Sequence, residues 1–159
     1  MKKVNTKDVA AEPRVSPGGK FSSAEQAISV ALGREPASTD LMKRQPFDVS
    51  IRRVTAGRSV CPFHAHTIQW EFYHVISGTG VARDNEGPTP IGPGDAFVFA
   101  PNEPHQLTAD AGGDLVLYIV ADNPPGDGCH YPDSGKWAVR IPRSTLIRSE
   151  PIDYYDGEE

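Results

Sequence analysis

Two stretches decide the fold of this chain: residues 57–78, which read GRSVCPFHAHTIQWEFYHVISG, and residues 94–109, which read GDAFVFAPNEPHQLTA. In the first stretch His64 and His66 are two residues apart. On an extended strand, side chains two residues apart point to the same face. The spacing therefore predicts that both imidazoles face one point in space.

Glu71 and His105 complete a set of possible metal ligands with these two histidines. Each residue alone has a plainer interpretation, since a single strand histidine or glutamate is usually an ordinary polar side chain. Burying three imidazoles and a carboxylate together costs several kcal/mol unless something pairs them. One divalent transition metal would do so and keep positions open for water or substrate.

Outside this set, the apolar residues repeat with a period of two from residue 47 onward. This alternation predicts six short strands, separated by turns rich in glycine, proline and asparagine: Phe47–Val54, Gln69–Ile76, Gly80–Asp84, Ala96–Ala100, Gln106–Thr108 and Leu115–Ala121. No helical pattern lies between them, which argues against a parallel α/β sheet. The pattern favours a sandwich or barrel.

The N-terminal region differs in character. Residues 1–20 are polar and show no periodicity, which predicts a flexible arm. Ser22–Leu32 is the one expected helix, with a serine N-cap and Gly33 directly after its end.

Composition narrows the function classes. The 159 residues carry a net charge of −5, so no basic field would attract nucleic acid or anionic lipid. Neither a membrane-spanning apolar run nor the apolar part of a signal peptide is found, so we expect a cytoplasmic protein. In that compartment Cys61 and Cys129 are expected to be reduced thiols.

The two stretches resemble the two motifs of the cupin superfamily. The first motif is matched as Gly57–x6–His64–x–His66–x4–Glu71–x6–Gly78, with one extra residue before the first histidine; the second is matched as Gly94–x5–Ala100–x–Asn102–x2–His105–x3–Ala109. Three positions of the second motif depart from the family, where proline, glycine and asparagine are usual in place of Ala100, Asn102 and Ala109. Asparagine also tolerates a left-handed turn, so Asn102 is a mild departure.

The resemblance implies an all-β fold, a single double-stranded β-helix (a jelly-roll barrel) with one short N-terminal helix. The expected organisation is a flexible arm, a short helix with its lead-in, the barrel core, a C-terminal extension packing on the barrel, and an acidic tail: 1–20, 21–46, 47–121, 122–148 and 149–159. The Cys-His-Tyr-Pro-Asp stretch at 129–133 is similar to that of a subset of small bacterial cupins that is largely uncharacterised.

The resemblance also implies that His64, His66, Glu71 and His105 are the metal ligands. The metal would be Fe, Mn, Ni or Zn. The ligand residues do not identify which one, because the metal bound at a mixed nitrogen and oxygen site depends on metal supply as well as on intrinsic affinity. Tyr73 is the candidate catalytic residue, since a phenol beside a metal can donate or accept a proton; plain core packing is its alternative role.

Strand alternation predicts the neighbours of this site. Gln69 shares the inward face with Glu71, whereas Trp70, Phe72 and His74 point away. Phe63, Phe97, Phe99 and Leu107 are candidates for an apolar wall. If the strand before His64 is regular, its parity turns Cys61 away from the metal. Arg52 or Arg53 could point inward and bind a substrate carboxylate; neither is assigned to the site, because an arginine on a barrel strand is usually exposed.

Two classes of function fit. The first is a metal-dependent enzyme of the dioxygenase, isomerase or lyase type that acts on a small metabolite. The second is a non-catalytic barrel that binds or senses a small ligand, and a purely structural metal is a third possibility. We expect a homodimer, with neither nucleic acid nor a membrane as a partner.

Overall fold

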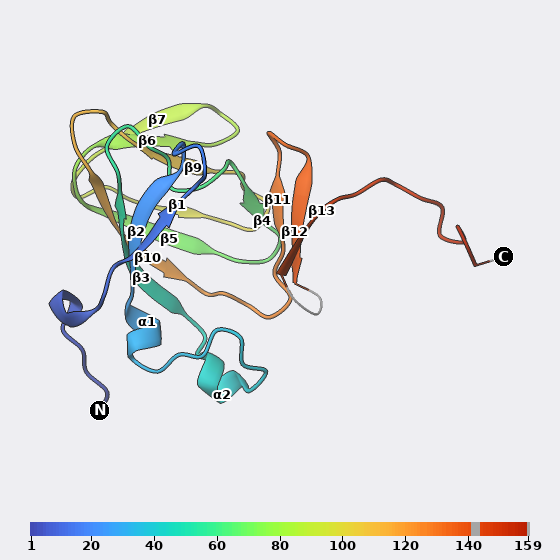
Figure 1. Ribbon diagram of the computed structural model, residues 1–159, viewed down its shortest axis with the longest axis horizontal. Coiled ribbons are helices and arrows are strands. Elements are labelled where there is room, and N and C mark those ends of the chain that lie inside the picture. Colours follow the sequence, from blue (N-terminus) through green and yellow to red (C-terminus); the bar gives the residue numbers. More distant parts are fainter. Residues whose placement is uncertain (141–143, 159) are drawn as a thin grey trace.

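The computed structural model describes residues 1–140 and 144–158, and its largest element is an antiparallel six-stranded sheet. In spatial order the sheet comprises β1 (Glu12–Val15), β2 (Ser22–Ala27), β3 (Asp48–Val54), β10 (Leu115–Ala121), β5 (Glu71–Ser77) and β8 (Ala96–Phe99). Figure 1 shows this sheet curving to form one side of a barrel.

Two smaller sheets complete the molecule. The three-stranded sheet comprises β7 (Pro88–Ile91), β6 (Gly80–Arg83) and β9 (Gln106–Ala109). The four-stranded sheet comprises β13 (Ser144–Arg148), β12 (Lys136–Arg140), β11 (Cys129–Tyr131) and β4 (Ala65–His66). The strand β4 thus connects the C-terminal strands to the region that carries the first histidine pair (Figure 1). The all-β jelly-roll fold is confirmed, with few helical residues.

The hydrophobic core lies between the inner face of the large sheet and the three-stranded sheet. Val54, Val75, Leu115 and Leu117 are fully buried on the large sheet, and Leu107 faces them from β9. Leu117 pairs across the sheet with Val75 on β5, so inward residues of neighbouring strands share one row. This alternation is the one that the period of two predicts, and it sets which side chains reach the barrel interior.

The expected helix at Ser22–Leu32 is wrong in its first half. Residues Ser22–Ala27 form β2, which pairs with β1 and β3, and only Ile28–Ala31 are helical, as α1. Serine and glutamine have no strong helical preference, so two flanking strands decide the conformation of this segment. A second short helix, α2, spans Leu41–Arg44.

The two ends of the chain are more ordered than the sequence indicates. The segment expected to be a flexible arm contains a 3-10 turn (Thr6–Asp8) and the edge strand β1, whose four residues are all exposed. Residues 129–140, which show no clear period, form β11 and β12; the last expected strand residue, Ile141, lies outside the described part. The sequence indicates one last strand at residues 138–141; its first three residues belong to β12. After β13 the described tail runs away from the barrel (Figure 1).

Across residues 1–140 and 144–158, no helix combines the length and the apolar character needed to cross a membrane.

Candidate metal centre

Backbone pairing brings the two sequence motifs together. His64 and His105 form an isolated antiparallel bridge, in which each backbone N–H donates to the carbonyl of the other residue at 3.1 and 2.8 Å. The chain reaches this bridge through Asn102, which has a φ of 66° and whose N–H donates to the carbonyl of His66 at 2.7 Å. Asn102 thus adopts the left-handed conformation that glycine usually supplies at this position of the motif.

The four candidate ligands lie in one cluster. One donor atom from each of His64, His66 and Glu71 lies within 4.8 Å of the others. His105 is attached to this group through Glu71, because its Nε2 lies 2.8 Å from Glu71 Oε2. The other carboxylate oxygen of Glu71, Oε1, lies 3.8 Å from His66 Nε2. The structure therefore brings together all four residues that the motifs predict.

Each histidine of the cluster has an oxygen atom at its Nδ1. The partner of His64 is the carbonyl of Pro62 at 3.1 Å, and that of His105 is the carbonyl of Glu103 at 3.1 Å. The partner of His66 is the carboxylate of Asp127, at 2.6 Å. These oxygens accept a hydrogen from Nδ1, which leaves Nε2 as the nitrogen available for the centre of the cluster.

Burial and mutual charge shift the pKa values of the cluster strongly. Burial, together with the neighbouring His105, lowers the pKa of His64 to about 4. Burial also disfavours the charged form of His66, but its hydrogen bonds to Asp127 and Cys129 outweigh this and raise its pKa to about 10. Burial likewise opposes ionisation of Glu71, yet the hydrogen bond and charge of His105 hold its pKa to about 2.

This donor set fits a divalent transition metal. Three imidazoles with their Nδ1 atoms engaged and one ionised carboxylate are the ligands that iron, manganese, nickel and zinc accept in proteins. Gln69 donates from Nε2 to Glu71 Oε1 at 3.1 Å, and its buried Oε1 has no hydrogen-bond partner among the described residues. A polar atom left unpaired at this depth is costly, which points to a further group in the same space.

Tyr73 lies directly beside the cluster, on the inward face that strand alternation predicts. Its hydroxyl donates to Glu71 Oε2 at 2.9 Å, and its ring stacks on Phe97 with centroids 5.5 Å apart. Burial and the adjacent Glu71 carboxylate raise the pKa of Tyr73 well above its usual value. The phenol is therefore a hydrogen-bond donor at neutral pH.

Apolar residues surround the other side of the cluster. Phe99 is buried and stacks face to face on His105, with centroids 4.1 Å apart and planes 2° apart, and Leu107 is almost fully buried nearby in the core. Phe63 is also buried, and the guanidinium of Arg83 lies 3.9 Å from its ring centroid. As predicted, Trp70 and Phe72 point outward and are exposed.

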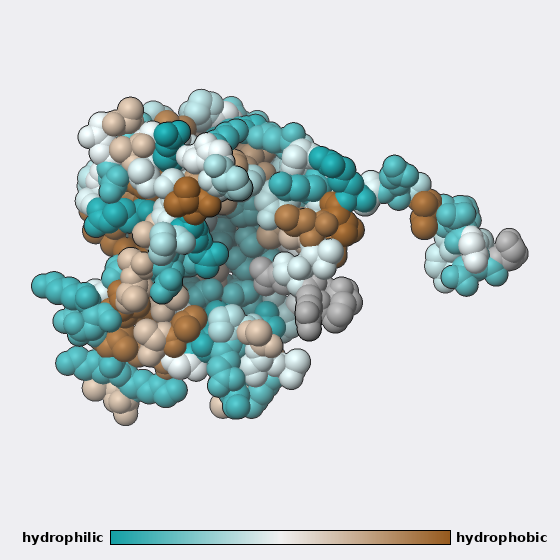
Figure 2. Space-filling view, viewed as in Figure 1, coloured by the Kyte–Doolittle hydropathy of each residue, from teal (hydrophilic) through white to brown (hydrophobic). Residues whose placement is uncertain are grey.

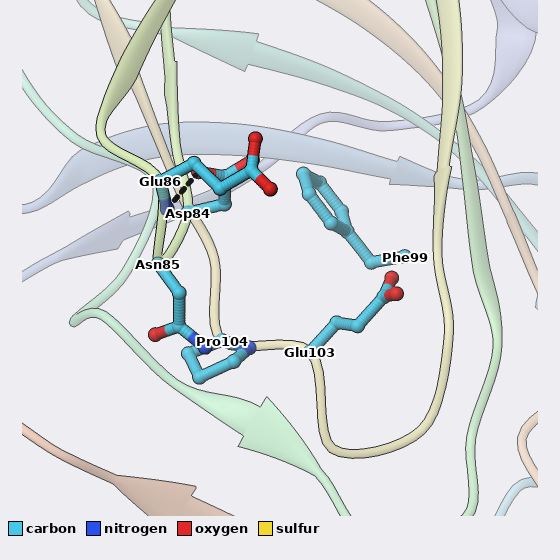
Figure 3. Close-up of a pocket in the computed structure, with 6 residues that line it drawn as sticks. All are labelled: Asp84, Asn85, Glu86, Phe99, Glu103 and Pro104. Carbon is cyan, nitrogen blue, oxygen red and sulfur yellow. Dashed lines mark hydrogen bonds between the residues drawn. The ribbon is translucent and has the colours of Figure 1, made fainter.

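A cavity of about 260 Å³ lies next to this wall, lined by Phe99, Pro104 and polar residues of two loops. Figure 3 shows Glu103 and the loop that contains Asp84 and Glu86 facing one another across it. Its acidic lining disfavours an anion. None of the four candidate ligands is among its lining residues; Phe99 lines the cavity and also stacks on His105.

The two arginines considered for substrate binding differ in placement. Arg52 faces inward in the row of Leu117 and forms an ion pair with Glu25 at 2.6 Å. Arg53 points outward and lies 3.7 Å from Asp114.

The C-terminal segment contributes residues that the motifs do not include. Cys129 pairs in register with His66 through β11 and β4, and its Sγ lies 3.4 Å from His66 Nδ1. The ring of Tyr131 lies over His64, with centroids 6.0 Å apart and planes 25° apart. His130 points to the opposite face and stacks on Trp137 at 4.5 Å. The extension therefore covers part of the cluster.

Sequence reasoning missed Asp127, and the regular strand on which the expectation for Cys61 depended is not formed. Asp127 is fully buried, and its only signal in the sequence is its position between two glycines just before the Cys-His-Tyr-Pro-Asp stretch. The Sγ atom of Cys61 lies 3.6 Å from His64 Nδ1, and not away from the site, because the segment before His64 is not a regular strand. Both cysteines are free thiols.

The surface is concave between the barrel and the C-terminal strands (Figure 2). Figure 2 shows a hollow between the barrel, the α2 region and the C-terminal strands, with hydrophilic residues lining its depth.

The three histidines and the glutamate lie together on the inner face of the barrel, where the two cupin-like motifs predict them. The family model described as a cupin domain matches residues 50–121, so this part of the chain is a cupin domain.

Solved structures with the same fold support this assignment. A protein from Acidithiobacillus ferrooxidans, provisionally named a sugar phosphate isomerase, has a TM-score of 0.77 at 18% identity, with 92% of each chain covered. A sugar phosphate isomerase of the cupin superfamily from Silicibacter pomeroyi also has a TM-score of 0.77, at 21% identity, covering 96% of this chain and 97% of that one. A polyketide cyclase from Streptomyces resistomycificus has a TM-score of 0.60 at 24% identity, covering 80% and 83%. No curated protein matches the sequence. At these identities the similarity shows the fold alone.

Proposed function

We propose that this chain is a metal-dependent cupin enzyme that acts on a small metabolite. The observation that carries the proposal is the convergence of His64, His66 and Glu71 within 4.8 Å, with His105 attached through Glu71. The four residues would hold one divalent transition metal, Fe, Mn, Ni or Zn. Such a metal supplies Lewis acidity or, as iron, dioxygen chemistry.

The residues around the metal would have separate tasks. Tyr73 donates a hydrogen bond to Glu71 and is the candidate for delivering a proton to a substrate held at the cluster. Gln69 holds the other oxygen of Glu71, which fixes the orientation of the carboxylate. The wall of Phe99 and Leu107 excludes water from one side of the site.

The class of substrate is anionic or hydroxylated in this proposal. Arg52 lies on the inner face of the barrel in an ion pair with Glu25 at 2.6 Å, and its Nε, without a hydrogen-bond partner among the described residues, is the atom that could donate to such a substrate. Two of the similar structures carry the name sugar phosphate isomerase, which makes sugar phosphates the first compounds to test for an isomerase.

The first test is the metal content of protein purified without an affinity tag or chelator, measured by inductively coupled plasma mass spectrometry. Close to one iron per chain supports oxygen chemistry, to be followed by oxygen uptake with small thiols, diketones and aromatic acids. Zinc, manganese or nickel supports the isomerase or lyase. Absence of metal, even after reconstitution, contradicts the proposal.

Variants locate the metal. His64→Ala and His105→Ala are expected to abolish tight binding, because each removes a proposed ligand. The matched control is His74→Ala on the outer face of β5. Full metal stoichiometry in both of the first two variants would place the site elsewhere.

A non-catalytic binding or sensing barrel is the second candidate. The stacking of Tyr131 on His64 favours it, since a covered cluster leaves less room for a reacting substrate. Binding of a small ligand without turnover, in protein with its full complement of metal, would support this alternative.

A further inference from the structure

The hydrogen bond that orients His66 comes from a distant part of the chain. Asp127 Oδ2 lies 2.6 Å from His66 Nδ1, although the two residues are 61 positions apart. The other oxygen of Asp127 is held by Thr67 Oγ1 and by the backbone N–H of Ile68, both at 3.2 Å. Two donors next to His66 therefore fix the carboxylate, and its remaining oxygen faces the imidazole.

The other two histidines of the cluster are oriented locally. The Nδ1 atoms of His64 and His105 face the carbonyl of the residue two positions earlier, Pro62 and Glu103 respectively. A backbone carbonyl can only accept a hydrogen bond, so the local chain keeps the hydrogen of these rings on Nδ1. For His66 the same result depends on one side chain of the C-terminal segment.

We propose that Asp127 is a positioning residue of the metal centre, which keeps a hydrogen on Nδ1 of His66 and so presents Nε2 to the metal. The inference rests on the proposed function, because it assumes that His66 binds the metal. A carboxylate that accepts from the far nitrogen of a ligand histidine fixes the tautomer and the ring plane, and raises the basicity of the ligand nitrogen. The C-terminal extension would then be part of the site itself.

Cys129 is the competing partner of the same nitrogen. Its Sγ lies 3.4 Å from His66 Nδ1, compared with 2.6 Å for the oxygen of Asp127. A thiol is a weak acceptor, and the charged oxygen is both closer and stronger. The geometry therefore assigns the orienting role to Asp127.

The test is Asp127→Asn in the full chain. The amide oxygen can still accept from Thr67 and Ile68, but the amide NH2 group would face His66. The hydrogen of the neutral ring should then move to Nε2, the nitrogen that a metal needs free. Nitrogen-15 NMR of histidine-labelled, metal-free protein reports whether Nδ1 of His66 carries hydrogen in each chain, and zinc titration should show binding weakened about 10–100-fold.

Two variants serve as controls. Asp122→Asn makes the same substitution in the same loop, where the carboxylate accepts from the N–H of Trp70 at 3.0 Å and touches no histidine. Cys129→Ala removes the competing partner. Both should leave the hydrogen on His66 Nδ1 and keep zinc binding within a few-fold of the unmodified chain.

The outcomes are separable. If Nδ1 of His66 carries no hydrogen in the unmodified chain, the proposal is wrong. It is also wrong if the hydrogen stays on Nδ1 in Asp127→Asn, or if it leaves Nδ1 in Cys129→Ala. If the unmodified chain takes up no metal, the proposed function fails and the metal-positioning role fails with it. The nitrogen spectra would still show whether Asp127 orients the ring.

Discussion

Tyr73 is the residue next to the proposed ligands whose hydrogen could reach a substrate. Its hydroxyl is 2.9 Å from Glu71 Oε2, and burial keeps the phenol protonated. Tyr73→Phe removes this hydroxyl and leaves the ring in the core. We expect unchanged metal content and a turnover at least about 100-fold lower, because proton transfer by a positioned side chain contributes a factor of that order.

The measurement is the rate with whichever compound the substrate screen identifies. Tyr118→Phe is the matched control, since Tyr118 lies on the outer face of β10, in register with His74. Unchanged turnover in Tyr73→Phe would assign Tyr73 to the core alone.

At the scale of secondary-structure elements, the hairpin of β11 and β12 is held to the barrel by an exposed ion pair. Nη1 and Nη2 of Arg83 at the end of β6 donate to Asp133 in the hairpin turn, at 2.9 and 3.0 Å. The hydrogen bonds from Arg83 hold the pKa of Asp133 below its ordinary value. A carboxyl group whose pKa is lowered in the folded state stabilises that state above its unfolded pKa of about 4.

This contribution should disappear as the pH falls through the lowered pKa of Asp133. We therefore expect amide hydrogen exchange of β11 to become faster, relative to β3, as the pH falls below about 4. In Asp133→Asn the exchange of β11 should already be faster at pH 6, and it should lose this part of the pH dependence. Equal pH profiles in the two proteins would show that the ion pair does not hold the hairpin.

The strands that sequence predicted are those in which burial alternates along the strand. Leu115–Ala121 matches β10. The other expected strands between residues 47 and 121 begin and end within two residues of β3, β5, β6, β8 and β9. In these segments one face is buried, so the residues themselves carry the signal. The same alternation correctly placed Gln69 and Tyr73 beside Glu71.

The elements that sequence missed depend on partners far away in the chain. Ser22–Ala27 has no apolar alternation, and becomes a strand because β1 and β3 lie on either side of it. Asp127 lies in a loop rich in glycine and proline, where a carboxylate gives no periodic signal. Asp127 reaches His66 because β11 pairs with β4, and this long-range pairing cannot be predicted from local sequence propensity.

At the scale of the whole molecule, an apolar patch on the outer face of the large sheet bears on assembly. Phe72 and Ile76 on β5 and Val98 on β8 are 40–50% exposed, and Phe72 and Val98 are paired in register. Contiguous exposed apolar residues often mark a protein interface. We therefore expect the homodimer to form through this face, whereas the N-terminal β1 pairs with β2 of its own chain.

Light scattering at micromolar concentration tests the dimer. Val98→Arg should give a monomeric mass and keep its metal, because it places a charge in the patch. Val15→Arg on β1 is the control and should remain dimeric. A monomeric mass for the unmodified chain would contradict the prediction.

The pairing of β4 with β11 has a consequence for the order of events during synthesis. The ribosome releases His64, His66 and Glu71 about 60 residues before Asp127 and Tyr131. From residue 105 onward the nascent chain thus carries all four motif residues, while the segment that covers and orients the cluster is still to be made. The hydrogen bond that orients His66 must wait for this late, long-range contact, so the proposed site would reach its final form only after residue 127 has been made. A chain interrupted just after Ala121 would retain the whole motif and lack the acceptor at His66.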